Sequence, residues 1–153
     1  MAHAHQIIPR LWLGDKNASM DVAFLRRNNI TVVFNCTKDL PFHPGVPTKY
    51  RVPVNDDLKA VEINNLGAWA PEIVVKLLGE YKRGRSVLIH CFAGMQRSAA
   101  VMAMVLLVLT QKTPDEIMAF IRSKRAVAFF PGVNFEPSIR RFYASYHAAR
   151  QPV

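Results

Sequence analysis

The chain has 153 residues, of which 50% are hydrophobic and 20% are charged, and its formal net charge at pH 7 is +9. This length and composition fit one ordinary globular domain, and we expect a single domain over residues 1–153 with its core at about 6–146. Two cysteines are too few for a disulfide framework, so these numbers argue against a small secreted scaffold.

The expected cellular location of the protein rests on two sequence features, the N-terminus and the longest apolar run. The N-terminus shows neither the charged start nor the apolar core of a signal peptide. The longest apolar run, residues 99–109, is too short to span a bilayer. We therefore expect an intracellular protein without a membrane association, cytoplasmic and with the nucleus left open, and a monomer by default.

The positive charge favours anionic partners, such as nucleic acid, phosphorylated protein or an acidic membrane face. It is dispersed, with only short clusters at residues 82–85 and 122–125. Charge alone therefore selects no partner.

The first half of the chain predicts strands with one short helix. Two edge strands are expected at 6–8 and 11–14, ending at Pro9 and Gly14. Ser19 is a candidate cap for a helix over 21–27. The expected strands that follow are a β-branched one at 30–36 and a shorter one at 49–54, before a polar loop at 55–60.

The second half predicts helices around one apolar strand. Pro71 suits the first turn of a helix over 71–82. The continuous apolar run 86–90 is typical of a central parallel strand, and 98–110, without a polar face, predicts a fully buried helix. Thr113 and Glu116 form a capping box for a helix reaching about residue 124, and a last helix is expected over 136–149. Strands separated by helices predict an α/β fold: a central, mostly parallel sheet flanked by helices.

Cys91 stands directly after the central strand, and Arg97 follows six residues later at the start of the buried helix. Ligands of open α/β sheets bind beyond the carboxyl ends of the strands, where backbone N–H groups and a helix N-terminus attract anions. Gly94 allows the loop to turn tightly, and the Arg97 guanidinium can bind two phosphoryl oxygens at once. The pattern therefore predicts a phosphate cradle.

The same positive surroundings favour the thiolate form of Cys91, which is the nucleophilic form of cysteine. Ser98 can donate a hydrogen bond to that sulfur, and His90 is expected to help fix the loop from behind. The stretch therefore predicts a nucleophile built into a phosphate-binding loop.

The segment "HCFAGMQRSAA" resembles the signature loop of the cysteine-dependent protein tyrosine phosphatases, in particular their dual-specificity branch. The branch pattern is His-Cys-x-x-Gly-x-x-Arg-Ser, usually with Ala before Gly. The resemblance extends over about residues 6–146, through "IIPRLWLGDKNAS", "ITVVFNCT", "YRVPVNDD" and "AFFPGVNFEPSIRRFY". It implies a protein tyrosine phosphatase-like fold.

The resemblance also implies a catalytic set. Cys91 would attack phosphorus, Asp56 would protonate the leaving oxygen, and Ser98 would assist the thiolate when the phosphocysteine is hydrolysed. Asp57, the next residue, is the alternative acid. The phosphate-binding loop would consist of Phe92, Ala93, Gly94, Met95, Gln96 and Arg97. Neither a metal nor another cofactor is expected.

The roles of three further residues near this catalytic set are left open by the sequence. Gln96 departs from the branch, which commonly has Ser there. Asn134 is expected to brace the signature loop by hydrogen bonding, with an ordinary loop residue as the alternative. Cys36 is expected to be a small buried core residue, with a redox partner of Cys91 as the alternative.

The expected function is hydrolysis of phosphotyrosine and of phosphoserine or phosphothreonine, with phosphorylated proteins as partners. Two alternatives share the loop: an RNA 5′-phosphatase or triphosphatase, which the positive charge would suit, and a pseudophosphatase that binds phosphoproteins without turnover. Phosphoinositides are a third possible substrate, although Phe92, Met95 and Gln96 offer no positive charge for further phosphates.

Overall fold

The computed structural model describes residues 2–150. In chain order its elements are β1 (Ala4–Ile8), β2 (Leu11–Gly14), α1 (Lys16–Ser19), α2 (Val22–Arg27), β3 (Ile30–Asn35), β4 (Thr48–Arg51), α3 (Ala60–Lys82), β5 (Ser86–His90), α4 (Arg97–Thr110), α5 (Pro114–Lys124) and α6 (Glu136–Arg150). None of the helices within these residues is long and apolar enough to cross a membrane.

The five strands form one sheet in the order β1-β2-β5-β3-β4. Only the β1–β2 pair is antiparallel, so the predicted α/β class with a mostly parallel sheet is confirmed. The prediction that β2 is an edge strand is wrong, because β2 pairs with β1 on one side and with β5 on the other. Leu11 and Leu13 are fully buried there, which is what an inner strand requires.

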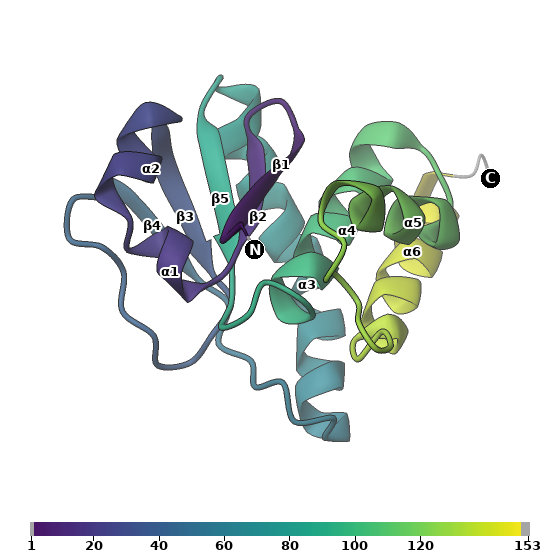
Figure 1. Ribbon diagram of the computed structural model, residues 1–153. Coiled ribbons are helices and arrows are strands. Elements are labelled where there is room, and N and C mark those ends of the chain that lie inside the picture. Colours follow the sequence, from purple (N-terminus) through teal and green to yellow (C-terminus); the bar gives the residue numbers. More distant parts are fainter. Residues whose placement is uncertain (1, 151–153) are drawn as a thin grey trace.

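Helices cover both faces of the sheet (Figure 1). Along β3, Val32 and Phe34 belong to the large core under α3 to α6, whereas Val33 belongs to a smaller core under α2. Successive side chains of a strand point to opposite faces, so one apolar strand supplies both cores. The continuous apolar runs of β3 and β5 follow from this position.

The long helix α3 starts at Ala60, eleven residues before the expected start at Pro71, and Pro71 lies inside it. A proline within a helix removes one backbone hydrogen bond and crowds the preceding turn. The buried residues Leu66, Ala70, Ile73 and Val74 continue one apolar stripe on both sides of the proline. Packing of that stripe therefore outweighs the local preference, and the prediction placed the helix start too late.

Two aspartates, and not Ser19, cap the short helices between β2 and β3. The side chain of Asp15 accepts from the N–H groups of Asn17 and Ala18, and that of Asp21 accepts from the N–H of Phe24. Ser19 is buried inside α1 and donates to the Lys16 carbonyl. The predicted cap at Ser19 is therefore wrong, and α1 was not expected.

The later elements agree more closely with the sequence pattern. Strand β5 has the predicted bounds, α4 begins one residue earlier than expected, and the capping box of Thr113 and Glu116 is present at α5. Strand β4 ends at Arg51, before the expected residue 54. The N–H of Val52 still bonds to the Asn35 carbonyl of β3 (2.9 Å), whereas the N–H of Val54 bonds to the Val52 carbonyl (2.9 Å) and not to the sheet.

Candidate active site

The connection between β5 and α4 forms the floor of an open cavity of about 340 Å³. The central strand ends at His90 and the buried helix begins at Arg97, so this connection lies at the carboxyl edge of the parallel strands (Figure 1). The cavity is lined by Asp56, Cys91, Phe92, Ala93, Met95, Gln96, Arg97, Phe130 and Asn134. It therefore combines the β5–α4 connection with segments before α3 and before α6.

The Cys91 sulfur lies at the base of this cavity and is nearly inaccessible, with 3% of the residue exposed. Its only hydrogen-bond contact among the described residues is the Ser98 hydroxyl, with 3.1 Å between Sγ and Oγ. Ser98 is in the first turn of α4 and is fully buried. A hydroxyl at this position can stabilise negative charge on the sulfur, as the sequence predicted.

The guanidinium of Arg97 carries a donor without a partner. Its Nη1 donates to the Val54 carbonyl (3.0 Å), whereas its Nε is buried and makes no hydrogen bond. A buried unpaired N–H of a cation is costly, and an anion at the site would satisfy it. The arginine is thus held in place by one bond and keeps donor capacity for an oxyanion.

Gly94 lets the loop pack tightly against the end of β2. Its φ is +67°, and a Cβ there would lie 2.5 Å from the Gly14 carbonyl oxygen. Both the left-handed backbone and the close approach exclude other side chains. The sequence prediction of a tight turn at this glycine is confirmed.

Arg125 supports the same loop through two hydrogen bonds. The sequence pattern showed this residue only as a member of the charged cluster 122–125 and did not predict its contact with the loop. Only 1% of the residue is exposed, and burial lowers the pKa of its guanidinium. Its Nη2 donates to the Ala93 carbonyl (3.0 Å) and its Nε to that of Gly94 (2.9 Å). Because the N–H of a trans peptide points opposite to its C=O, the amides of Gly94 and Met95 point away from Arg125.

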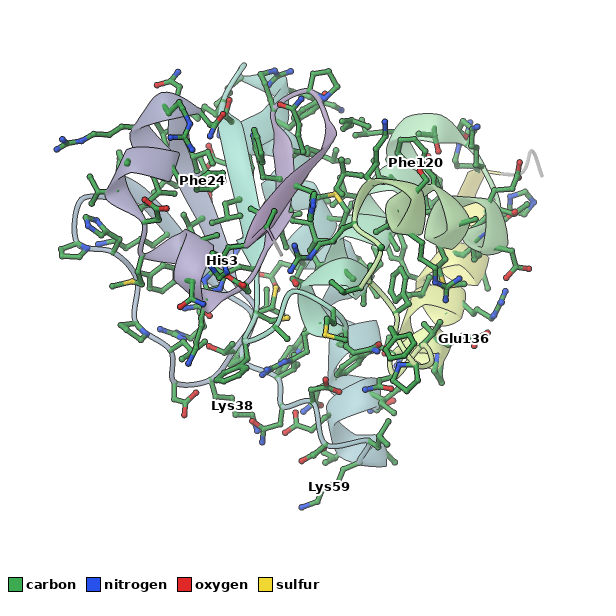
Figure 2. The ribbon with its side chains drawn as sticks, viewed as in Figure 1. His3, Phe24, Lys38, Lys59, Phe120 and Glu136 are labelled. Carbon is green, nitrogen blue, oxygen red and sulfur yellow. The ribbon has the colours of Figure 1, made fainter. Side chains whose placement is uncertain are left out.

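The N-terminal strand reaches this brace. The Nη1 of Arg125 lies 3.0 Å from Nδ1 of His5 in β1, and burial followed by the nearby Arg125 charge lowers the pKa of that imidazole. His3, labelled in Figure 2, directly precedes this strand, and its Nδ1 pairs with Asp15 at 2.7 Å. The strand therefore packs directly behind the loop.

Of the two candidate acids, Asp56 lines the cavity. Its Oδ1 accepts a hydrogen bond of 2.8 Å from the Asn134 side-chain amide. Asp57 instead accepts from the backbone N–H of Lys59 (3.0 Å), just before α3. Lys59 marks the lower end of that helix in Figure 2 and projects into solvent. The geometry thus favours Asp56 as the acid over its neighbour.

Gln96 ties the signature loop to the α5–α6 connection. Its Nε2 donates to the carbonyls of Gly132 (2.7 Å) and Phe130 (3.2 Å), and its Oε1 accepts from the Asn134 backbone N–H (3.0 Å). The residue is 5% exposed. Asn134 therefore contacts the loop through its backbone and Asp56 through its side chain.

His90 is fully buried beneath the loop. Its Nδ1 lies 3.2 Å from the Cys91 carbonyl oxygen, and its Nε2 has no partner. Burial, only partly opposed by that hydrogen bond, lowers the pKa of His90 to about 4. The imidazole is therefore neutral at physiological pH and can donate to the Cys91 carbonyl, which fits the expected supporting position.

Both cysteines are free thiols, and Cys36 is fully buried in the main core. Burial, with a smaller contribution from Cys91, raises the pKa of the Cys36 thiol. A buried neutral thiol behaves as a small apolar side chain, so its surroundings fit the expected core role. The redox alternative stays a prediction.

The comparison with protein families gives one match that covers most of the chain. Residues 11–145 match the model described as "Dual specificity phosphatase, catalytic domain". The chain belongs to the dual-specificity phosphatase family. The resemblance inferred from the signature loop is thereby confirmed.

Two curated members of this family are about a third identical to the chain over the residues that align. Dual specificity protein phosphatase 2 of Mus musculus is 33% identical over 123 residues, which cover 80% of this chain and 37% of the mouse protein. Its Homo sapiens counterpart is 31% identical over 138 residues, which cover 90% of this chain and 42% of the human protein. The chain therefore spans about two fifths of the length of these relatives.

Solved structures share the fold over nearly the whole chain. A variant of human DUSP28 aligns with a TM-score of 0.86 and 25% identity, covering 97% of this chain and 99% of that one. The human tyrosine phosphatase-like serine/threonine/tyrosine-interacting protein aligns with a TM-score of 0.82 at 20% identity, covering 94% and 97%. The predicted protein tyrosine phosphatase-like fold is therefore confirmed.

Proposed function

We propose that this dual-specificity phosphatase hydrolyses phosphotyrosine and phosphoserine or phosphothreonine in proteins through a phosphocysteine intermediate. One observation carries the proposal. A single cavity holds the Cys91 sulfur beside Ser98, an arginine with an unpaired buried N–H, and the carboxyl of Asp56. These are the nucleophile, the oxyanion binder and the acid that two in-line displacements at phosphorus require.

In the first displacement, the Cys91 thiolate attacks phosphorus and an S–P bond forms. The P–O bond to the leaving group breaks, and Asp56 gives its proton to that oxygen. Arg97 and the loop amides of residues 92–97 bind the three equatorial oxygens, where charge is concentrated in the transition state. Electrostatic stabilisation of these oxygens is the largest contribution we assign to the loop.

In the second displacement, Asp56, now a carboxylate, takes a proton from a water molecule. The water oxygen attacks phosphorus, the S–P bond breaks, and inorganic phosphate leaves. Ser98 donates a hydrogen bond from its hydroxyl to the departing thiolate across the 3.1 Å contact. The enzyme then returns to its starting state, with a thiolate and a protonated acid.

Phosphorylated proteins are the proposed partners because the curated relatives are named protein phosphatases. The family match and these names give no support to the RNA 5′-phosphatase alternative. A pseudophosphatase that only binds phosphoproteins stays as the second candidate, since the site would bind phosphate with or without turnover. The presence of Cys91, Arg97 and Asp56 around one cavity favours the enzyme.

The test is phosphate release from a phosphotyrosine peptide, a phosphothreonine peptide of the same sequence, and an RNA with a 5′-triphosphate. We expect release from both peptides, none after Cys91→Ser, and most of it kept after Cys36→Ala, a change at the other cysteine. Release from RNA alone would refute the protein substrate. Absence of release with retained peptide binding would establish the pseudophosphatase instead.

A further inference from the structure

A buried positive charge lies behind the signature loop. Arg125 is 1% exposed, and its guanidinium donates to the carbonyls of Ala93 and Gly94. None of the ion pairs among residues 2–150 includes this arginine. Burial lowers the pKa of Arg125, and negative charge on Asp15 and on Cys91 opposes that effect. Because a buried cation without a paired carboxylate is costly, the charge of Arg125 favours negative charge in the cavity.

This charge reaches the cavity through two peptide groups of the loop. The carbonyls of Ala93 and Gly94 share their peptide groups with the N–H groups of Gly94 and Met95, which point away from Arg125. Neither N–H finds an acceptor among residues 2–150. A hydrogen bond from a cation polarises the peptide group that accepts it, so the opposite N–H becomes a stronger donor. Arg125 therefore both orients and strengthens two donors for an oxyanion in the loop.

The N-terminal segment holds the other side of the same guanidinium. Its Nη1 donates to the Ala2 carbonyl (3.1 Å) and lies 3.0 Å from Nδ1 of the half-buried His5 in β1. A guanidinium has donors only, so Nδ1 accepts, and the proton of the neutral imidazole lies on Nε2. A protonated imidazole would offer no acceptor and would bring two positive groups into contact. Burial and the charge of Arg125 both lower the pKa of His5 below 6.5, as a neutral ring requires.

The charged groups around His5 would not compensate for its protonation. Strand β1 packs against β2 and α5. On the β2 side, the partner of His5 is Leu13, which does not titrate, and Asp15 beyond the end of β2 is bound to His3 at 2.7 Å. On the α5 side, the charged group that faces His5 is Arg125. A proton on His5 would therefore act mainly on Arg125.

We propose that His5 is a positioning residue for phosphate binding, because its neutral ring holds Arg125 against the carbonyls of the signature loop. This deepens the proposed function and rests on phosphate binding in that loop. Protonation of His5, or loss of its ring, removes an acceptor of Arg125 and loosens the guanidinium. The loop then loses part of the preorganisation of its amides. Binding of an oxyanion therefore weakens when His5 takes up a proton, although the protein becomes more positive.

The test measures the binding of sulfate, a tetrahedral dianion whose charge does not change between pH 7 and pH 5. The full chain carries Cys91→Ser, so that no thiol titrates in the cavity. Dissociation constants come from NMR titrations of the loop amides at both pH values, where His90, with a pKa of about 4, stays mostly neutral. Sulfate should bind roughly three- to tenfold more weakly at pH 5, the range of one hydrogen bond.

Two changes at His5 separate the hydrogen bond from the titration. His5→Asn keeps an acceptor near the place of Nδ1 and has no titrating ring, so it should bind sulfate like the parent at pH 7 and equally well at pH 5. His5→Val suits a strand but removes the acceptor, and it should weaken sulfate binding roughly three- to tenfold already at pH 7.

His43→Asn is the matched control in the β3–β4 connection. The Nδ1 of His43 also accepts a hydrogen bond, from the Gly45 N–H (2.9 Å), but has no contact with Arg125. This variant should keep both the affinity for sulfate and its dependence on pH. A loss of that dependence in His43→Asn would assign the effect to the wrong histidine.

The outcomes distinguish this inference from the proposed function. Sulfate binding that is equal at both pH values, that tightens at pH 5, or that stays pH-dependent in His5→Asn would overturn the role of His5. Lower stability of His5→Val with unchanged sulfate affinity would overturn it too, since it would show a structural role only. Absence of sulfate binding in every variant would refute the phosphate site and this inference together. Absent turnover with the expected sulfate binding would refute the enzyme alone and support the role of His5.

Discussion

The side-chain amide of Asn134 donates a 2.8 Å hydrogen bond to Oδ1 of Asp56, across 78 residues of sequence. This bond uses Oδ1 as an acceptor and leaves Oδ2 without a side-chain partner to carry the proton that the proposed mechanism assigns to Asp56. The amide thereby holds the carboxyl of the proposed acid at the cavity. It links the acid to the α5–α6 connection, which Gln96 in turn links to the signature loop.

Replacing Asn134 with alanine should slow the step that needs an acid. We expect turnover of a phosphothreonine peptide, whose leaving alkoxide requires protonation, to fall roughly tenfold or more, within the usual range of general acid catalysis. Turnover of p-nitrophenyl phosphate, whose leaving group is far less basic, should fall much less. The measurement is kcat for both substrates, and equal losses would contradict the positioning of Asp56 by Asn134.

The same phosphothreonine peptide decides whether Asp56 or Asp57 is the general acid. Asp56→Asn should lower kcat for the phosphothreonine peptide by roughly a hundredfold or more. Asp57→Asn should lower it only slightly, because Asp57 bonds to the Lys59 backbone and does not line the cavity. The reverse ranking would assign the acid to Asp57.

Gln96 should contribute to stability through its three hydrogen bonds. Gln96→Met keeps the shape of the side chain but leaves carbonyls of the α5–α6 connection without their donor. We expect a loss of roughly 1–3 kcal/mol in the free energy of unfolding, measured with urea. Gln6→Met, at an exposed position of β1, is the control and should cost little; a similar loss at both positions would refute this role.

The elements that the sequence predicted well are those in which one local pattern decides the structure. Strand β5 and helix α4 are mostly apolar because most of their residues are buried, and the capping box at Thr113 is complete within four residues. Pro71 misled the prediction because the packing of a 23-residue helix overrides a local preference.

The candidate site also contains a part that the local sequence predicts and a part that only the fold reveals. Cys91, Arg97 and Ser98 lie within eight residues, so their spacing carries the signal. The Asn134–Asp56 bond and the brace by Arg125 join segments 78 and about 31 residues apart. Nothing in the local sequence of Arg125 distinguishes a buried guanidinium from a surface charge, so only the folded chain reveals it.

His90 should make the stability of the fold depend on pH. Its folded pKa of about 4 lies below the ordinary value of 6.5, so the unfolded chain binds the proton first as the pH falls. The contribution of His90 to the free energy of unfolding is therefore fully present above pH 6.5 and is lost as the pH falls towards about 4. At pH 5 the free energy of unfolding should be about 2 kcal/mol lower than at high pH.

Urea unfolding at pH 7 and pH 5 measures this dependence. His90→Asn, which has no titrating ring, should flatten the decline, whereas His147→Asn at an exposed site of α6 should not. A decline that is unchanged in His90→Asn would show that other groups cause it.

The most direct test of the account is to trap the phosphocysteine. Ser98→Ala removes the hydroxyl that lies 3.1 Å from the sulfur and should slow hydrolysis of the intermediate more than its formation. After reaction with a phosphotyrosine peptide and an acid quench, mass spectrometry should find one phosphoryl group on the peptide that contains Cys91. Phosphate release without any phosphorylated Cys91, in the variant and in the wild type alike, would contradict the mechanism.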